Sequence, residues 1–203
     1  AVIRGGGRHG VTIGSPISLW VKNNDFENWS EAMSSTKVAK GVDIRKQTKI
    51  VPGHADFPGA LKYQHQDLRN VLERASARET AARVAAASFA RILLSELGVS
   101  IHSRVLSNGE EIDATPIENV DWQYVEKSDA RASNKDIEKK FISTINKAKK
   151  DKTTVGGVIQ ITASGLVVGL GNHIQWDLKL DGRIAQAMMS INAAKGVEIG
   201  QGF

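Results

Sequence analysis

Apolar residues recur at two spacings along this chain of 203 residues, and each spacing predicts its own kind of element. Repeats of three and four residues predict helices in the second half of 66–98, over 134–150 and over 178–191. Alternation predicts strands at 17–22, at 99–106, on both sides of Ser164-Gly165 within 154–171, and in the glycine-punctuated segment 192–200. Helices that alternate with strands predict an α+β or α/β sandwich.

The two longest predicted helices differ in their faces. The helix within 66–98 carries a stripe of mostly small residues, which lets another element approach closely: Ala77, Ala81, Val84, Ala85, Ser88 and Ile92. The helix over 134–150 has Asn134 as its cap, acidic residues in its first turn and lysines in its last, all of which suit the helix dipole. Its buried stripe is predicted to be Ile137, Phe141, Ile145 and Ala148.

The segment between the first strand and the first helix is polar and irregular. Within 23–48, Asp25 to Trp29 together with Met33 form either a short helix or a lid-like loop. The next stretch, KIVPGHADFPGALKY at 49–63, surrounds His54 with two prolines and two glycines. Such a turn fixes where an imidazole points, which suits a group that titrates near neutral pH and equally suits an ordinary structural turn.

Composition narrows the classes of function. The absence of cysteine excludes disulfides, thiolate catalysis and cysteine-ligated metal, and no apolar run is long enough to span a bilayer. The formal net charge of +5 fits an anionic partner, although a mildly basic surface explains it equally well. Aromatic residues make up only 5% and do not interleave with basic ones, which disfavours nucleic-acid binding.

The segment ERASARET at 73–80 is the strongest local signal. Ser76 and Glu79 have the spacing of a capping box that opens the long helix, and Arg74 lies just before it. Exposed N–H groups, the positive end of the helix dipole and an arginine together suit an anion such as a phosphate or the polar edge of a flavin. The alternative is a well-capped helix whose arginines pair with the neighbouring glutamates.

The remaining candidates are weaker. The histidines other than His54, which are His9, His65, His102 and His173, lack the spacing of a helical zinc motif. The stretches RGGGRHG and VGGV match neither a Walker A motif nor a dinucleotide-binding fingerprint. The sequence therefore supports neither a metal site nor a common nucleotide-binding fold.

Three long stretches together resemble the chorismate synthase family. They are RHGVTIGSPISLWVKNNDFENW at 8–29, PGHADFPGALKYQHQDLRNVLERASARETAARVAA at 52–86 and GLGNHIQWDLKLDGRIAQAMMSINAAKGVEIGQGF at 169–203. They stand in the family's order and are nearly ungapped, and the wording HIQWDLKLD is similar to the Gram-positive type. The resemblance is weakest over 99–150.

This resemblance implies an activity and a set of partners. Members of the family convert 5-enolpyruvylshikimate 3-phosphate to chorismate by a 1,4-anti elimination of phosphate, and they require reduced FMN, which supplies electron density transiently. The resemblance also implies a β-α-β sandwich of the α+β class, a homotetramer, a cytoplasmic location, and no membrane or nucleic-acid partner. It leaves open whether NADPH reduces the flavin in the same protein.

The resemblance also implies roles for individual residues. His54 matches the histidine that protonates the reduced flavin. Arg74, Ala75 and Ser76 match an FMN-contacting triplet, and Asn192 and Ala193 match a second FMN contact. No metal ligand is implied.

Some positions depart from the family pattern. Val51 stands where the family has an arginine before Pro-Gly-His-Ala-Asp, and Gly5-Gly6-Gly7 stand where it has Ser-Gly-Val. The family's chain is longer at both ends, and the missing segments hold the histidine that is the presumed acid for the leaving phosphate, substrate-binding arginines and further flavin contacts. We therefore expect residues 1–203 to be the central part of a single domain. Such a fragment is expected to be inactive by itself, or to act only as a flavin-binding or assembly module.

Overall fold

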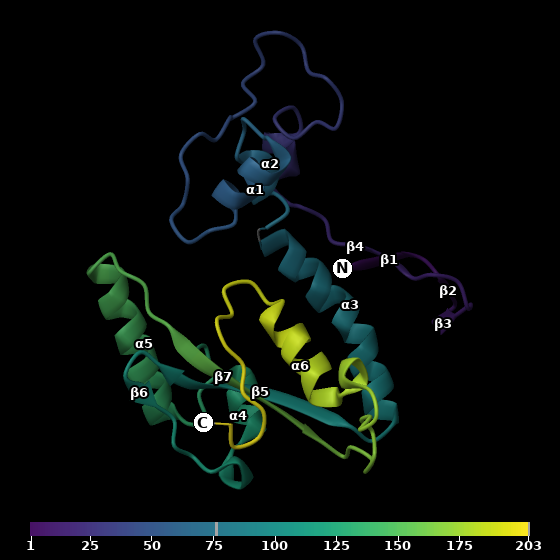
Figure 1. Ribbon diagram of the computed structural model, residues 1–203, viewed down its shortest axis with the longest axis vertical. Helices are drawn as coiled ribbons and strands as arrows, with labels where there is room; N and C mark the ends of the chain where they lie inside the picture. The colour runs from purple at the N-terminus through teal and green to yellow at the C-terminus, as the bar shows by residue number, and fades with distance from the viewer. Residues whose placement is uncertain (76, 203) are drawn as a thin grey trace. The chain divides into compact units, whose positions relative to one another are not determined.

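The computed structural model describes residues 1–75 and 77–202, and of residues 77 and 78 only the backbone. The chain divides into two compact units (Figure 1). The first unit joins residues 1–90 to residues 171–203, and the second holds residues 91–170. The prediction that 1–203 form part of a single domain stays a prediction.

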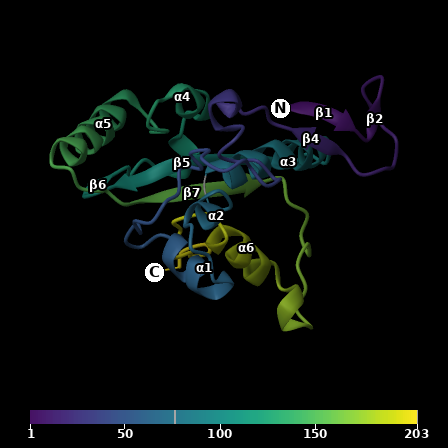
Figure 2. The same cartoon turned by 90° about the horizontal axis from the view of Figure 1, so that it is seen from above.

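Two small antiparallel sheets open the first unit. β1 (Val2–Gly5) pairs with β4 (Ser18–Trp20), as Figure 2 shows. β2 (Gly7–Arg8) pairs with β3 (Val11–Thr12) (Figure 1). The strand predicted at 17–22 is confirmed but shorter. Gly6 between β1 and β2 has a φ of +86°, and a Cβ there would lie 2.5 Å from the carbonyl oxygen of Pro16. Only glycine fits this position, so the departure at Gly5-Gly6-Gly7 still supplies the required residue.

The polar segment after β4 contains the 3-10 helix η1 (Phe26–Trp29). Asp25 accepts a hydrogen bond of 2.6 Å from the Trp29 indole N–H. The guanidinium carbons of Arg45 and Arg69 lie 4.2 and 4.9 Å from the centre of a Trp29 ring, which is cation–π geometry. The short-helix alternative is therefore the correct one, and Trp29 ties this segment to α2.

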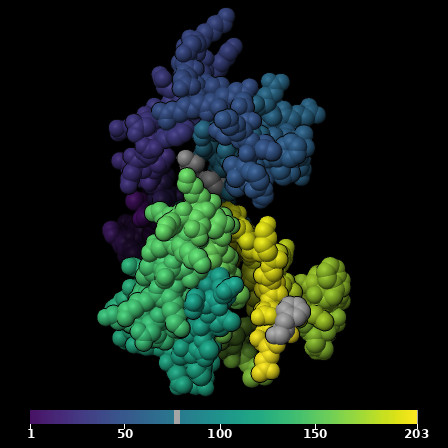
Figure 3. Space-filling view, turned by 90° about the vertical axis from the view of Figure 1, so that its left-hand side faces the viewer, coloured from purple at the N-terminus to yellow at the C-terminus, as the bar shows by residue number. Residues whose placement is uncertain are grey.

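Helices make up the rest of the first unit. Their bounds are α1 (Asp56–Tyr63), α2 (Arg69–Leu72), α3 (Ala77–Glu96, which continues into the second unit), η3 (Trp176–Leu178) and α6 (Leu180–Met189). α1 packs against α2 where a Cβ on Gly59 would lie 2.5 Å from a methyl carbon of Val71, so glycine allows the close approach. In Figure 3 the yellow-green atoms of the segment before α6 stand to one side of the yellow atoms of the C-terminal part of the chain.

The second unit is a three-stranded antiparallel sheet with helices. The strand order is β6 (Glu111–Ile112), β5 (Ser100–Asn108), β7 (Gly157–Ser164). The helices are η2 (Ile117–Asn119), α4 (Trp122–Lys127) and α5 (Lys135–Lys150). The Asn134 side chain accepts from the N–H groups of Asp136 and Ile137, so the predicted cap is confirmed.

The core of the second unit combines an apolar and a polar part. Val125, Ala132 and Phe141 are fully buried. Beside them, buried Arg104 of β5 donates to the Gln160 side chain of β7 at 2.7 Å. Of the predicted stripe of α5, Phe141 is buried whereas Ile145 is exposed, so the buried face is narrower than the spacing indicates.

Some predicted elements are wrong. No strand follows Ser164-Gly165, and none forms within the described residues of 192–200. A strand needs a hydrogen-bonding neighbour, and none of the described strands pairs with either segment. Val168 is accordingly 99% exposed. On α3 the predicted face is also open, because Val84 and Ile92 are 66% and 62% exposed while Ala85 is half-buried. The observed mixture of helices and small antiparallel sheets belongs to the α+β class.

Candidate functional site

The loop before α1 holds His54 in a tight turn. The His54 N–H donates to the carbonyl oxygen of Val51 at 3.1 Å, across Pro52 and Gly53. Gly53 has a φ of +77°, which residues with a Cβ rarely adopt, so this turn depends on glycine. The His54 side chain is 34% exposed. The ring is therefore fixed at its base and still reachable.

Asp56, the first residue of α1, braces this turn from inside. Its buried carboxylate accepts from the N–H of Val51 at 2.8 Å and from the N–H of Phe57 at 3.0 Å. The hydrogen bond from Val51 foremost, helped by those from Phe57 and by the charge of His54, lowers the pKa of Asp56 below its ordinary value. Nδ1 of His54 lies 3.7 Å from Oδ1 of Asp56, and this buried nitrogen has no hydrogen-bond partner.

Sequence reasoning singled out His54 but not Asp56. The spacing His-Ala-Asp alone gives no sign that the carboxylate is buried, because that depends on the turn folding back over it. The departure at Val51 becomes clearer as well. Val51 braces Asp56 through its backbone N–H, and the residue as a whole is 50% exposed, so the bracing does not depend on which side chain stands at position 51.

Arg74 and Ala75 form the connection between α2 and α3. The Arg74 side chain is exposed, and the Ala75 N–H donates to the carbonyl oxygen of Val71 at 3.0 Å, which continues the turn of α2. Ser76, the predicted cap, lies outside the described residues. α3 is 20 residues long, so its first turn carries the full positive end of a helix dipole beside Arg74. This arrangement suits an anion.

Glutamates near the start of α3 pair with arginines four residues away in the sequence. Glu79 pairs with Arg83 of α3, and Glu73 pairs with Arg69 of α2 at 3.6 Å. Arg83 in turn donates from Nη1 to the Ser190 hydroxyl at 2.7 Å. Because Ser190 ends α6, this bond places the end of α6 beside the second turn of α3.

Asn192 and Ala193 closely follow Ser190, whose hydroxyl accepts the hydrogen bond from Arg83 in the second turn of α3. Ala193 has a φ of +68°, an uncommon left-handed conformation for a residue with a Cβ. Arg74 and Ala75 thus lie directly before α3, and the segment with Asn192 and Ala193 starts from Ser190, which contacts the second turn of the same helix. Among the described residues, no hydrogen bond or ion pair joins the His54 side chain to these four predicted flavin contacts.

Two of the other histidines lie beside aromatic rings. His102 stacks on Trp122 with ring centres 4.8 Å apart, and the rings of His65 and Tyr63 are 6.1 Å apart. Over residues 1–75 and 77–202, no three potential ligands from His, Asp or Glu gather as a metal site would require. The same residues include no helix with the length and apolarity needed to cross a bilayer.

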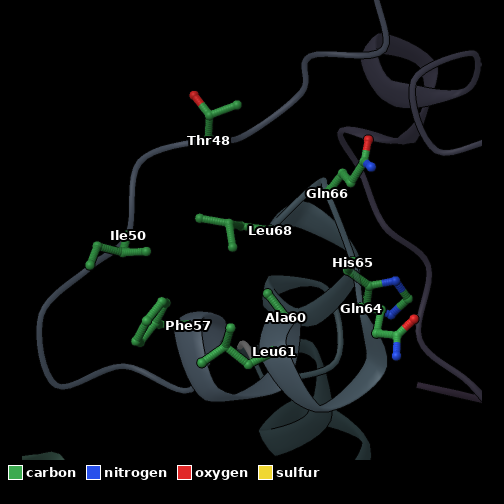
Figure 4. Close-up of a pocket in the computed structure, with 9 residues that line it drawn as sticks. All are labelled: Thr48, Ile50, Phe57, Ala60, Leu61, Gln64, His65, Gln66 and Leu68. Carbon is green, nitrogen blue, oxygen red and sulfur yellow. The ribbon is translucent and has the colours of Figure 1, made fainter.

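An open pocket of about 490 Å³ lies beside α1. Figure 4 shows that its apolar lining comes from the chain before α1, from α1 itself and from the loop that follows. The lining residues are Thr48, Ile50, Phe57, Ala60, Leu61, Gln64, His65, Gln66 and Leu68. None of the predicted flavin contacts lines this pocket, so it is separate from the candidate site.

The whole chain is similar to chorismate synthases. The family model described as chorismate synthase matches residues 1–203. The chain is 45% identical to chorismate synthase 2 of Bacillus cereus over 98% of its length and 52% of the relative's. It is 47% identical to chorismate synthase of Symbiobacterium thermophilum, covering 97% of this chain and 52% of that one.

A solved structure agrees with these sequence matches. A crystal structure of chorismate synthase superposes with a TM-score of 0.80 at 39% identity, and it covers 100% of this chain and 55% of the crystallised one. The chain thus spans about half the length of the curated relatives it matches. Both the sequence and the fold point the same way, and the chain belongs to the chorismate synthase family.

Proposed function

We propose that the protein catalyses the elimination of phosphate from 5-enolpyruvylshikimate 3-phosphate to give chorismate, with reduced FMN as its cofactor. The observation that carries this proposal is the match of all 203 residues to the chorismate synthase family, with relatives of that name at 45–47% identity. The reaction is a carbon–oxygen lyase step that belongs to the shikimate pathway of aromatic amino acid synthesis.

The residues around the start of α3 fit a flavin mononucleotide. Arg74 and the positive end of the dipole of α3 supply positive potential for an anionic or polar edge. In this proposal Arg74, Ala75 and Ser76 contact the flavin from one side, and Asn192 and Ala193 from the end of α6. Bound reduced FMN supplies electron density to the substrate while phosphate leaves.

His54 is proposed to be the catalytic residue that donates and recovers a proton at the flavin. Two observations support this role: the turn through Pro52 and Gly53 fixes the ring at its base, and about a third of the side chain remains exposed. Imidazole changes its charge near neutral pH, which suits a group that must both give and take a proton.

The proposal is tested on the full-length protein. The phosphorylated substrate and chemically reduced FMN are mixed with it under anaerobic conditions, and chorismate is measured. Formation of chorismate is expected, and a complete lack of chorismate under these conditions would overturn the proposal. Adding NADPH with oxidised FMN in a parallel reaction shows whether the protein reduces its own flavin.

The proposal also covers the oligomeric state of the protein, its location in the cell and the activity of residues 1–203 alone. We propose a homotetramer in the cytoplasm, which sedimentation of the full-length protein and localisation of a tagged copy test. A chain of residues 1–203 alone is proposed to give no turnover, since it spans about half the length of its relatives. Chorismate formation by those residues alone would contradict this part.

A further inference from the structure

We propose that Asp56 is a positioning residue that keeps the neutral His54 ring protonated on Nδ1, so that Nε2 is the atom that exchanges protons with a bound partner. Only the identity of that partner, the flavin, rests on the proposed function. The protonation pattern itself follows from the loop at 51–57 and can be measured without any ligand.

The first step is the position of Nδ1. This nitrogen is buried and has no hydrogen-bond partner, and Oδ1 of Asp56 lies 3.7 Å away. A buried nitrogen cannot be satisfied by bulk water, so its neighbours in the protein decide whether it carries a hydrogen. The buried carboxylate of Asp56 places an acceptor oxygen 3.7 Å from Nδ1.

The second step is the charge of Asp56. The carboxylate is fully buried, yet it accepts N–H donors from Val51 and Phe57, and the hydrogen bond from Val51 contributes most to lowering its pKa. Asp56 is therefore ionised near neutral pH and can only accept hydrogen bonds. A lone pair on Nδ1 facing this carboxylate would be repelled, whereas an N–H on Nδ1 would be attracted.

The third step is distance. At 3.7 Å the two atoms are just beyond hydrogen-bond range, so a hydrogen bond between them requires a small movement of the His54 ring. Hydrogen bonds of catalytic groups are often long in the free protein and tighten when a ligand binds. A bond from Nδ1–H to Asp56 leaves Nε2 with the free lone pair of the neutral ring, and in the protonated ring it leaves Nε2–H as the transferable proton.

The backbone of the loop holds the Asp56 carboxylate in place beside His54. Asp56 is the first residue of α1, and the Val51 N–H donates to it across the intervening turn. The loop thus closes around the carboxylate through backbone atoms. This closure holds Asp56 still while His54, two residues earlier, stands against it.

The experiment is nitrogen NMR of the side chains of ¹⁵N-histidine in the full-length protein without flavin, at about pH 8.5, above the ordinary titration range of histidine. The His54 signals, assigned from the spectrum of His54→Gln, are expected to show the Nδ1–H tautomer in the wild type. In Asp56→Asn the tautomer ratio is expected to move by about tenfold toward Nε2–H, because the negative charge that faces Nδ1 is lost.

A matched control is Asp67→Asn. Asp67 also accepts two backbone N–H groups, from Gln47 at 2.9 Å and from Arg69 at 3.0 Å, and it has no recorded contact with a histidine. This variant is expected to leave the His54 tautomer unchanged. His102, which stacks on Trp122, is an internal reference whose signals should not move in either variant.

The outcomes separate clearly. An Nε2–H tautomer of neutral His54 in the wild type would overturn the inference, even if Asp56→Asn fails to fold. An equal change in Asp56→Asn and Asp67→Asn would also overturn it, because the effect would then reflect a disturbed loop. If the protein forms no chorismate but His54 shows the Nδ1–H tautomer, the proposed function is wrong and the role of Asp56 still stands.

Discussion

Two aspartates in the described part of the chain are completely buried, and their surroundings differ. Asp113 of the second unit accepts from the Thr115 N–H, from the Ser133 N–H and from the Ser133 hydroxyl, and Nη1 of Arg104 lies 3.5 Å away. Asp56 of the first unit accepts two backbone N–H groups and faces an imidazole rather than a guanidinium.

The difference separates a structural carboxylate from a candidate functional one. The partners of Asp113 are fixed: Arg104 also donates to Gln160 and to the Thr115 carbonyl oxygen, so the network ties β5, β7 and the segment before α5 together. Asp56 instead faces His54, an imidazole that can gain or lose a proton and whose side chain is partly exposed. Burial alone therefore does not identify a site; a titratable partner open to solvent does.

The largest expected effect concerns His54, the titratable neighbour of Asp56. His54→Ala in the full-length protein should lower the rate of chorismate formation by about 10²–10⁴-fold, the usual contribution of a positioned acid or base. The midpoint of urea unfolding should stay close to that of the wild type, because the side chain is partly exposed and makes no hydrogen bond through Nδ1. Unchanged turnover would make His54 a structural residue.

The second prediction concerns Asp113, the structural carboxylate of the comparison. Asp113→Ala should lower the free energy of unfolding by about 3–5 kcal/mol, because it leaves Arg104 as an uncompensated buried charge. Denaturant unfolding of the full-length protein measures this change. The double variant Arg104→Met with Asp113→Leu is the control and should recover much of the loss. A loss below about 1 kcal/mol in Asp113→Ala would show that the network is not structural.

The third prediction uses acid. Burial tends to raise the pKa of Asp113, but the hydrogen bonds from Thr115 and Ser133 together hold it below the ordinary value. A carboxylate whose folded pKa is lowered stabilises the fold above its unfolded pKa of about 4, and this stability is lost as the pH falls through the folded value. Asp113→Asn should flatten the dependence of unfolding free energy on pH below about pH 4. If the unfolding free energy of Asp113→Asn depends on pH below about pH 4 as strongly as that of the wild type, the pKa of Asp113 is not lowered by folding.

The smallest expected effect concerns how helices begin in the two units. Asn134 caps α5 through its side chain, whereas the N-cap of α1 is Ala55, with no side-chain hydrogen bond. Asn134→Ala should therefore cost about 1 kcal/mol of unfolding free energy, measured in urea. Ala55→Gly is the matched change at α1 and should leave the stability nearly unchanged. Equal losses in both variants would show that the cap of α5 contributes nothing specific.

Much of the fold could be predicted from local patterns. The helix over 134–150 with its Asn134 cap, the helix within 66–98 and the strand at 99–106 all form close to the expected bounds. The strands expected after Ser164-Gly165 and within 192–200 do not form among the described residues, because alternation indicates a strand but does not supply its neighbour.

The sequence alone determined the elements that depend on near neighbours, the family to which the motifs belong, and the candidates His54, Arg74, Ala75, Ser76, Asn192 and Ala193. Caps, turns and helix stripes are encoded within a few residues, so they can be read locally. Only the tertiary structure revealed that Asp56 is buried against His54 and that Arg83 draws the end of α6 to the start of α3. Both depend on how the backbone returns on itself, and a hydrogen bond across 107 positions leaves no local trace in the sequence.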